Sequence, residues 1–450
     1  MTQRTVRAVS TRRQSMCAAG TAAAGAWWLA ACGAAETPAG KPITEPITIT
    51  YGNDWSNANK SPIMKAALEA FARRYPLITV KWNDLKSDTV NLNAKLTAQF
   101  ASGTPDDVLL LPGQNVPYHR DQGNFVDLAP YLKSAKIDLK SYTYIDPATS
   151  VGTKLHFLPF SVGTTVWYVN KTLFQRAGVP LPNESWTWND AADAARRISK
   201  PDENIYGFGP ALGSSVTELL PLIYSNGGHH ISADFKQTQL TQPAALEAIV
   251  WVADRITRDL SWVPPDKRDL TGFNNGNVAM EINGIGGLGS PNGTSGRIAT
   301  LAGKFEWDIM LQPKAPRTGK RVQTYQQQPN GVVAKPTGGT ARIEAGFTLA
   351  QYLAGEDTQL IIAKDRGNVP ALRKLATTSP YIDPPPASMP ILGKTFDAVA
   401  EPRLFNGYDD WVAAYTTALF DIWSGKVSAN AGAQLANAAG DAVLARLTRK

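Results

Sequence analysis

The chain has 450 residues, of which 43% are hydrophobic and 18% charged, and this length is enough to bury the cores of two lobes. Its formal net charge of +7 includes four arginines within residues 1–31, where there is no acidic residue, so the rest of the chain carries only +3. A charge this small does not indicate a nucleic-acid partner, and the two cysteines, Cys17 and Cys32, leave no disulfide or thiolate chemistry beyond residue 32.

Residues 1–31 are typical of an export signal. Arg12-Arg13 precede an Ala/Gly-rich apolar stretch shorter than the roughly 20 residues of a membrane span, and this pattern also fits twin-arginine export. Leu29-Ala30-Ala31-Cys32-Gly33 matches a lipobox, so we expect Cys32 to be acylated and to anchor the mature chain outside the cytoplasm. The alternative is an ordinary secretory signal with an unmodified cysteine. Residues 32–46 are then the acylated cysteine and a flexible tether.

The segment after the tether alternates between strands and helices. We expect strands over 47–51, 78–82 and 107–111, the last a continuous apolar run of the buried parallel type. A helix beginning at Ser61 with Pro62 in its first turn, and a second over about 90–100, lie between them. This order predicts a doubly wound α/β lobe.

The second half continues with more helices. A break at Leu158-Pro159-Phe160 leads into a strand over 166–169, and 305–311 alternates as a further strand. Helical stretches are expected around 191–198, 217–225, 243–260, 341–354, 411–423 and 431–447.

The sequence carries no recognisable catalytic or metal-binding motif. His119, His156, His229 and His230 have no metal-ligand spacing, and we expect them in loops or the core. There is no nucleophile elbow, P-loop or dinucleotide glycine fingerprint. Asp106-Asp107 or Asp409-Asp410 could be imagined as a glycosidase pair, but that chemistry depends on separation in space, and Asp106 fits a turn or strand edge better. We therefore expect neither an enzyme nor a cofactor.

Several tryptophans lie beside polar or turn residues instead. Trp55 follows Asn53-Asp54, Trp186 and Trp188 follow Glu184, and Trp411 follows Tyr408. An aromatic face can stack on the C–H-rich face of a sugar while neighbouring amides bind its hydroxyls. Trp55 and Trp411 are the better candidates for such contacts, whereas Trp82, Trp251 and Trp307 fit core positions.

Four motifs, spread over most of the chain beyond the tether, share one resemblance. They are Gly103-Thr104-Pro105-Asp106-Asp107-Val108; Leu158-Pro159-Phe160 through Tyr168-Val169-Asn170-Lys171-Thr172-Leu173-Phe174 and Ala177-Gly178 to Trp186-Thr187-Trp188-Asn189-Asp190; Phe273-Asn274-Asn275-Gly276-Asn277-Val278-Ala279-Met280-Glu281-Ile282-Asn283-Gly284; and Gly367-Asn368-Val369-Pro370. In this order they resemble the extracytoplasmic solute-binding proteins of carbohydrate ABC importers, the group that includes maltose-binding protein.

The resemblance implies an α/β protein with the two-lobe periplasmic-binding-protein fold of type II. Each lobe is a doubly wound sheet flanked by helices, and the ligand binds in a cleft at the hinge. Lobe 1 is expected over 47–160 plus about 314–365, and lobe 2 over about 161–313 plus 366–450. The implied function is a lipid-anchored, monomeric receptor that closes on a sugar or oligosaccharide and delivers it to the permease subunits of an ABC importer.

The resemblance also places the ligand-binding residues. They are Asn53, Asp54, Trp55, Gln114 and Asn115 from lobe 1, and Gly163, Thr164, Gly284, Gly286, Asn368, Tyr408 and Trp411 from lobe 2 and the crossings, with Pro329-Asn330-Gly331 as weaker candidates.

This chain also departs from the family pattern. Val169 stands where many members have Tyr, Gly286 where maltose binders stack an aromatic ring, and the charged groups expected near Gly163 and Gln114-Asn115 are absent. These departures argue against maltose and favour a neutral or weakly anionic sugar. A receptor with this fold could instead bind a glycerol-phosphate ester, a polyamine or ferric ion. Two other functional classes are a polysaccharide-degrading enzyme and a lipoprotein adhesin. The sequence does not identify the sugar or the permease.

Overall fold

The computed structural model describes residues 41–447 except 59, 86–91, 211, 213–215, 217, 294, 335–338, 398 and 401. The export signal, Cys32 and most of the tether lie outside the described residues. Among those described, no helix combines the length and hydropathy that a membrane crossing requires.

Strands from both halves of the sequence form one mixed sheet in the order β2-β1-β3-β10-β6-β8-β7, with β9 and β11 also paired to β6 and β12 to β10. β1, β2 and β3 are parallel, as the sequence predicts, and β10 is antiparallel to both β3 and β6. The strands are β1 (Ile47–Asn53), β2 (Ile78–Asp84), β3 (Val108–Leu110), β6 (Phe157–Asn170), β7 (Tyr206–Gly209), β8 (Val278–Gly284), β9 (Trp307–Met310), β10 (Gln323–Val332), β11 (Val369–Pro370) and β12 (Val399–Ala400), besides a separate β4 (Ser150–Val151) and β5 (Lys154–Leu155) pair.

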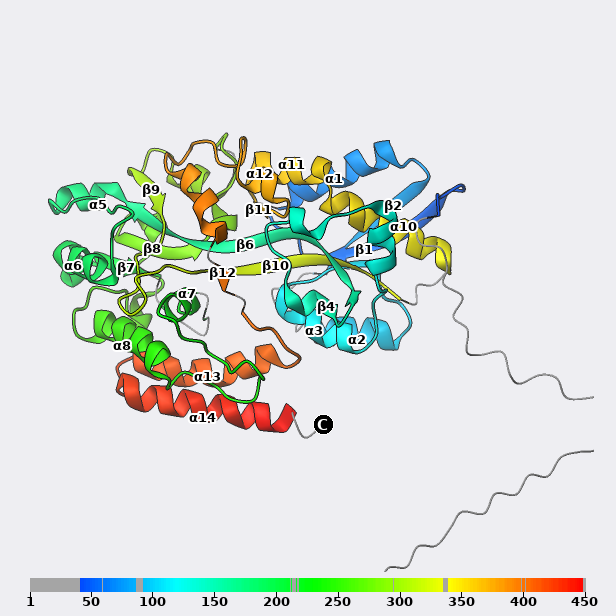
Figure 1. Cartoon of the computed structure of the whole chain (residues 1–450). Helices are drawn as coiled ribbons and strands as arrows, with labels where there is room; N and C mark the ends of the chain where they lie inside the picture. The colour runs from blue at the N-terminus through cyan, green and yellow to red at the C-terminus, as the bar shows by residue number, and fades with distance from the viewer. Residues whose placement is uncertain are drawn as a thin grey trace, which may run out of the picture. The chain divides into compact units, whose positions relative to one another are not determined.

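Helices surround this sheet (Figure 1). They are α1 (Ser61–Arg74), α2 (Leu92–Ala101), α3 (Val116–Asp121), α4 (Ala129–Ala135), α5 (Lys171–Arg176), α6 (Trp188–Ile198), α7 (Leu220–Ser225), α8 (Pro243–Thr257), α9 (Gly296–Leu301), α10 (Thr340–Ala354), α11 (Glu356–Asp365), α12 (Arg373–Ala376), α13 (Tyr408–Trp423) and α14 (Ala429–Leu447). The expected helices are confirmed with shifted ends; α7, for example, begins only at Leu220.

β6 is longer than the sequence suggests. Leu158-Pro159-Phe160 were expected to break the chain, but they belong to this strand. Pro159 fits because it pairs with Pro329 at a register shift in β10, where ladder hydrogen bonding is already interrupted. β6 and β10 therefore run side by side from the region of β1–β3 to the region of β7–β9 (Figure 1).

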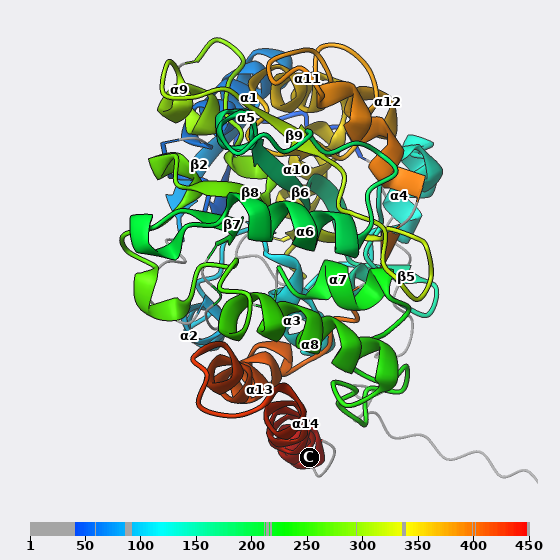
Figure 2. The same cartoon turned by 90° about the vertical axis from the view of Figure 1, so that its left-hand side faces the viewer.

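Different parts of β6 belong to separate apolar cores, with Phe160 in one and Val162 in another. One core joins β1, β3, α1 and α10 through residues such as Ile49, Phe71 and Leu349. A much larger core joins the helices and strands around Trp167 and Trp262, and it includes both C-terminal helices. Figure 2 shows α6 close to β7 and β8, and α8 between α6 and the C-terminal helices α13 and α14; α6 packs on β7, and α8 packs against α7, α13 and α14.

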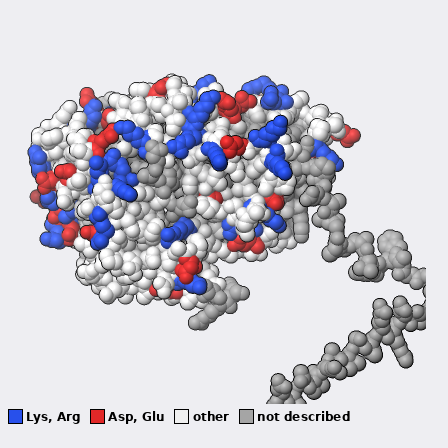
Figure 3. Space-filling view, in the orientation of Figure 1, with Lys and Arg blue, Asp and Glu red and all other residues white. Residues whose placement is uncertain are grey.

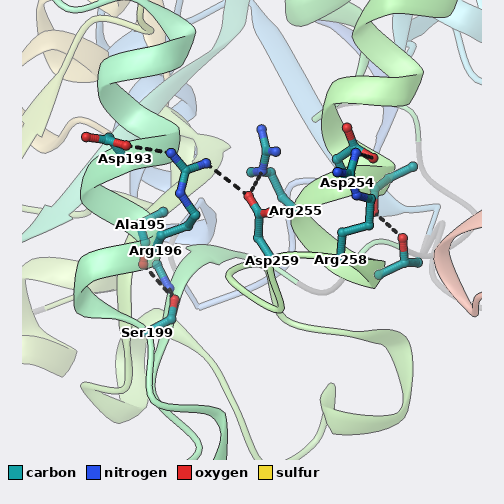
Figure 4. Close-up of polar contacts among 11 residues, drawn as sticks. Asp193, Ala195, Arg196, Ser199, Asp254, Arg255, Arg258 and Asp259 are labelled. Atoms are coloured by element: carbon teal, nitrogen blue, oxygen red, sulfur yellow. Dashed lines mark hydrogen bonds and ion pairs between the residues drawn. The ribbon is translucent and has the colours of Figure 1, made fainter.

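Charged side chains join α6 to the end of α8. Asp259 accepts hydrogen bonds or ion pairs from Arg196 of α6 at 3.2 Å and from Arg255 of α8 at 2.6 Å (Figure 4). Arg196 also pairs with Asp193 on its own helix, and Arg258 with Asp254. These contacts lie between helices on the outside of the fold, so we assign them a structural role.

A buried ion pair fixes the chain just before β3. Asp107 accepts from Arg342 Nε of α10 at 2.8 Å and from Thr50 N of β1 at 2.7 Å. Its neighbour Asp106 is also buried and accepts from Asn83 of β2. Asp106 therefore occupies the strand-edge position that the sequence indicates, and both carboxylates are buried.

Candidate functional site

The described residues form a large cleft beside the middle of β6 and β10. Its main chamber has a volume of about 1590 Å³ and reaches from α2 and α3 to the start of α13. A smaller chamber of about 730 Å³ continues toward β8 and α7. The residues that line both chambers are Lys60, Gly113, Gln114, Gly163, Gln326, Asn368, Tyr408 and Asp409. The two chambers are thus parts of one site.

The floor of the cleft is the crossing of β6 and β10. Gly163 pairs with Gln326 in this ladder, and the Gln326 side chain is exposed although its strand is central in the sheet. Because Gly163 has no side chain, a ligand can approach the backbone of β6 beside this glutamine. The floor offers amide and backbone groups and no charge.

Asn368 lies where the chain returns to pair with β6 through β11. Its Nδ2 donates to Ser161 Oγ at 3.1 Å, which fixes the orientation of the amide. A Cβ placed on Gly286 would come within 3.2 Å of Asn368 Oδ1, and one on Gly163 within 3.8 Å. Oδ1 therefore lies between these two glycines, on the surface of the cleft, where it can accept a hydrogen bond from a hydroxyl group.

The β8 side of the cleft is held by a buried network. Tyr168 donates from its hydroxyl to Gly284 O at 3.1 Å, and Arg297 lies 4.0 Å from the centre of the Tyr168 ring. Arg297 pairs with Glu281 at 2.7 Å, and Glu281 in turn accepts from Asn283 Nδ2 at 3.0 Å. Asn283 and Gly284 both line the smaller chamber. The network fixes a side-chain amide and a backbone carbonyl at this wall.

The N-terminus of α13 forms the opposite wall. Gly407 adopts φ +93° and lies directly before Tyr408, the first residue of the helix. Tyr408 lines both chambers with its neighbour Asp409. Burial, with Asp410 nearby, raises the pKa of the Asp409 carboxyl. Burial also raises the pKa of the Tyr408 phenol, which stays a neutral donor.

The loop after β1 and the start of α1 contribute Asp54 and Lys60. The Lys60 ammonium lies 5.1 Å from the centre of the Trp55 ring. Burial lowers the pKa of Lys60, and the nearby Asp54 carboxylate acts in the opposite direction. The charged groups of the main chamber are therefore Lys60 together with Asp54, Asp409 and Asp410, among many neutral polar groups.

The turn after β3 supplies Gln114 and Asn115. Gly113 begins this turn, and a Cβ there would come within 3.0 Å of Gln327 O on β10. Only a residue without a side chain lets the turn approach the floor strand this closely. Gln114 and Asn115 thereby reach the main chamber.

Most of the ligand-binding residues expected from the sequence meet in this cleft. The ones that line it are Asp54, Gln114, Asn115, Gly163, Thr164, Gly284, Gly286, Asn368 and Tyr408. Asn53, Trp55 and Trp411 do not line it, because each is fully buried. Pro329, Asn330 and Gly331 lie in β10 and are likewise buried.

The three buried residues hold the cleft walls in place. Asn53 Oδ1 accepts from Trp55 N at 2.9 Å and from Trp82 Nε1 at 3.0 Å. The Trp55 indole donates to Gln328 Oε1 at 2.9 Å.

Trp411 donates to Thr238 Oγ1 at 3.0 Å. A Cβ on Gly440 of α14 would lie only 2.8 Å from the Trp411 nitrogen. This indole therefore fills the contact between α13 and α14.

Sequence reasoning missed several lining residues. Lys60, Asn283, Thr324, Gln326 and Asp409 contribute polar groups to the cleft. One signal for Gln326 was available, because the run Gln326-Gln327-Gln328 puts three polar amides inside a strand that crosses the core. Gln327 itself is fully buried and donates to Tyr144 O at 2.7 Å.

The chemistry of the cleft is that of a binding site for a polar ligand. Among the described residues, no group of His, Cys, Asp or Glu side chains is arranged to hold a metal ion. On the face shown in Figure 3, Lys and Arg side chains are interspersed with Asp and Glu. Beside the charged groups named above, the cleft surface offers amides, hydroxyls, glycine backbone and the phenols of Tyr118 and Tyr408. These groups suit hydrogen bonding to hydroxyl-rich molecules.

Solved structures share this fold. An ABC substrate-binding protein from Listeria monocytogenes in complex with cycloalternan has a TM-score of 0.75 and is 18% identical, with 90% of this chain and 100% of that chain covered. A sugar-binding protein from Xanthomonas citri has a TM-score of 0.73 and is 16% identical, with coverage of 90% and 98%. The two-lobe α/β fold expected from the sequence is thereby confirmed.

Sequence comparisons agree with the fold. A binding protein of Brucella abortus (strain 2308) is 24% identical over 396 residues, which cover 86% of this chain and 91% of that protein. A mannitol-binding protein of Pseudomonas aeruginosa is 27% identical over 164 residues, or 36% of each chain. Residues 53–360 match the family described as bacterial extracellular solute-binding protein. Since this match spans most of the chain and both sides of the cleft, the chain belongs to the bacterial extracellular solute-binding proteins.

Proposed function

We propose that the protein is an extracytoplasmic carbohydrate receptor of an ABC importer, which captures a sugar or oligosaccharide in its cleft and releases it unchanged. The observation that carries this proposal is the cleft floor, where Gln326, Asn368 and the backbone at Gly163 present neutral hydrogen-bonding groups. Neutral donors and acceptors match sugar hydroxyls, whereas a polyamine or a phosphate ester calls for a strongly charged pocket.

Similar proteins support the sugar assignment. The structural neighbours include proteins bound to cycloalternan, to tagatose and to maltotetraose. The main chamber of this protein has a volume of about 1590 Å³, which has room for more than one sugar ring. An oligosaccharide is therefore the ligand that we favour.

The site that we propose consists of the nine expected residues that line the cleft, together with Lys60, Asn283, Gln326 and Asp409. Asn53, Trp55 and Trp411 act through the walls that they support. The proposed lobes meet within β6, with lobe 1 over 47–160 plus about 314–365 and lobe 2 over about 161–313 plus 366–450. The division is supported by the two apolar cores, since Phe160 belongs to one and Val162 to the other.

We further propose that the receptor acts as a monomer anchored by an acylated Cys32. The anchor rests on the lipobox alone, and the monomer is carried over from the family resemblance. Mass spectrometry of the protein isolated from membranes tests it: diacyl- or triacylglyceryl cysteine as the first residue is expected, and an unmodified Cys32 contradicts the anchor.

Thermal unfolding of the purified protein against a ligand panel tests the function. The panel contains mono- and oligosaccharides, sugar phosphates, polyamines and ferric ion. A sugar at about 100 times its dissociation constant stabilises the native state by about 2.7 kcal/mol, which raises the melting temperature by a few degrees. Recovery of that sugar unchanged supports a receptor. A shift only with phosphates, polyamines or iron, or a cleaved product, contradicts the proposal.

A further inference from the structure

The charged groups that line the cleft do not balance. Among the described residues, the main chamber is lined by three aspartates and one lysine: Asp54, Asp409, Asp410 and Lys60. Burial lowers the pKa of Lys60 and the nearby Asp54 carboxylate opposes that shift, so these two charges stabilise each other. Asp409 and Asp410 are neighbours in the first turn of α13, and no described residue forms an ion pair with either of them. This wall of the cleft therefore carries negative charge that no ion pair among the described residues offsets.

Asp409 differs from an ordinary carboxylate at a helix start. Carboxylates are common in the first turn of a helix because they complement its dipole, and by themselves they are no evidence for a ligand. Asp409 is accessible in the cleft and lines both chambers, yet desolvation, together with the Asp410 charge, raises the pKa of its carboxyl. Its surroundings thus destabilise the charged form, and a cation bound beside it would stabilise that form.

Tyr408 supplies a second, independent observation. Its ring packs on the aromatic side chains of His230, Phe405 and Trp411. The side chain is 9% exposed, and its hydroxyl forms no hydrogen bond with a described residue. Because a phenol buried to this extent usually has a hydrogen-bond partner, the hydroxyl is available to a ligand.

The charges around the Tyr408 hydroxyl show where it points. Burial raises the pKa of the phenol, and so do the carboxylates of Asp409 and Asp146. Asp409 lines both chambers, and Asp146 Oδ2 lies 3.7 Å from the position of a Cβ on Gly113, which lines both chambers as well. The hydroxyl therefore points from the buried ring toward the cleft, where carboxylates from two different segments act on it.

We infer that the ligand is an amino sugar, whose hydroxyl groups bind at the floor of the cleft and whose ammonium group binds at the carboxylates of Asp409 and Asp410. This inference rests on the proposed sugar-binding function and narrows its substrate class, in place of the neutral or weakly anionic sugar that the sequence favours. An ammonium group has three N–H donors and no acceptor, and the two carboxylates and the Tyr408 oxygen are acceptors. Hydrogen bonds from an ammonium to a carboxylate are charge-assisted and about twice as strong as neutral ones.

Matched sugars test the inference by isothermal titration calorimetry on the purified protein at about pH 6, where the amines are protonated. The probes are glucosamine, galactosamine, mannosamine and the β-1,4-linked disaccharide of glucosamine. Each is compared with its N-acetyl derivative and with its neutral parent sugar. For the sugar that binds, we expect the amino form to bind at least tenfold more tightly than both. Raising the salt concentration from about 0.05 to about 0.5 M should remove much of this advantage, because salt screens the charges.

Two variants locate the ammonium group. Asp409→Asn and Asp410→Asn keep the side-chain shape and remove the charge, so each should lower the ratio of amino-sugar to parent-sugar affinity severalfold. The ratio is the readout because damage to the fold would weaken both sugars alike. Tyr408→Phe should lower the ratio less, since it removes a neutral acceptor and keeps the ring. Asp269→Asn is the matched control, because this aspartate is exposed in a turn outside the cleft, and its ratio should equal that of the unchanged protein.

The possible failures have different meanings. If parent or N-acetyl sugars bind as tightly as the amino sugars, this inference is overturned while the sugar receptor stands. If the preference for the amino sugar survives in the Asp409→Asn, Asp410→Asn double variant, the ammonium binds elsewhere and the inference is also overturned. If no sugar binds, with or without an amino group, the proposed function itself fails, and the inference with it.

Discussion

Asn368 and Ser161 form a hydrogen bond of 3.1 Å, from Nδ2 to Oγ, that orients an amide at the centre of the cleft. The Ser161 hydroxyl in turn donates to Gln328 Oε1 at 3.3 Å, and the same oxygen accepts from the Trp55 indole at 2.9 Å. A buried tryptophan is thus linked through two polar side chains to Asn368, whose oxygen lies on the surface of the cleft. This chain of contacts connects Trp55 indirectly to the cleft.

Replacing Asn368 tests its place in binding. Asn368→Leu should weaken binding of the sugar identified by thermal unfolding at least tenfold, because a buried ligand hydroxyl would lose its acceptor, at a cost of about 1–3 kcal/mol. Ser161→Ala should have a smaller effect. Asn430→Leu, at an exposed position of α14, is the control. Titration calorimetry measures all three, and equal affinities for Asn368→Leu and the control would remove Asn368 from the site.

We expect the absence of a side chain at Gly286 to be as important for sugar affinity as the Asn368 amide. A Cβ there would lie 3.2 Å from both Asn368 Oδ1 and Gly367 O, which is closer than ordinary contact. Gly286→Ala should therefore displace the Asn368 amide and lower affinity severalfold. Gly272→Ala meets no atom within 4 Å and should bind normally. Undiminished affinity in Gly286→Ala would show that the loop adjusts and that Asn368 tolerates the shift.

The paired aspartates before β3 should differ sharply in their effect on stability. Asp107→Ala leaves Arg342 and Thr50 without their buried partner, so it should lower the free energy of unfolding by about 3 kcal/mol. Burial raises the pKa of Asp106, and its Oδ2 has no partner among the described residues. Asp106→Asn should therefore change stability by less than about 1 kcal/mol. Urea unfolding compares the two, and equal losses would contradict this division of roles.

A buried histidine should make the protein less stable in acid. Burial lowers the pKa of His119 to about 4, from 6.5 in the unfolded chain, and both ring nitrogens lack partners among the described residues. The unfolded state therefore binds a proton first as the pH falls. Stability is full above pH 6.5 and declines toward pH 4, by up to about 1.4 kcal/mol per pH unit.

The His119→Phe variant isolates this contribution. Its ring keeps the aromatic contacts with Tyr118 and Phe100 but cannot titrate. The difference in unfolding free energy between the variant and the unchanged protein should grow in favour of Phe as the pH falls from 7 to 4. A difference that stays constant over this range would assign the acid sensitivity to other groups.

The sequence predicts the fold well and the site only in part. Local patterns suffice for β1, β2 and β3, because β1 and β2 alternate apolar and polar residues and β3 is a continuous apolar run. Local patterns fail at Leu158-Pro159-Phe160. Pro159 fits in β6 because it lies opposite Pro329, where the register of β10 shifts. Such pairing depends on tertiary contact and leaves no local trace.

The candidate site residues likewise divide into those that the sequence predicts correctly and those that it does not. Glycines and amides carried over from the family motifs lie in the cleft, because their positions depend on strand ends that the family shares. The tryptophans were chosen for their polar sequence neighbours, yet Trp55 and Trp411 turn inward to Gln328 and Thr238. Those acceptors lie far away in the sequence. Lys60 and Asp409 were missed because a charged residue at a helix start is usually solvated.

The pairing of β10 with β3 and β6 also has a consequence for how the protein is made. These two strands are synthesised well before β10, and the sheet joins them only through it. As the chain emerges from the ribosome N-terminus first, β3 and β6 each keep an unpaired edge until residues 323–332 have followed. Such edges invite wrong pairing and aggregation. The central part of the sheet therefore cannot close until nearly three quarters of the chain has been translated.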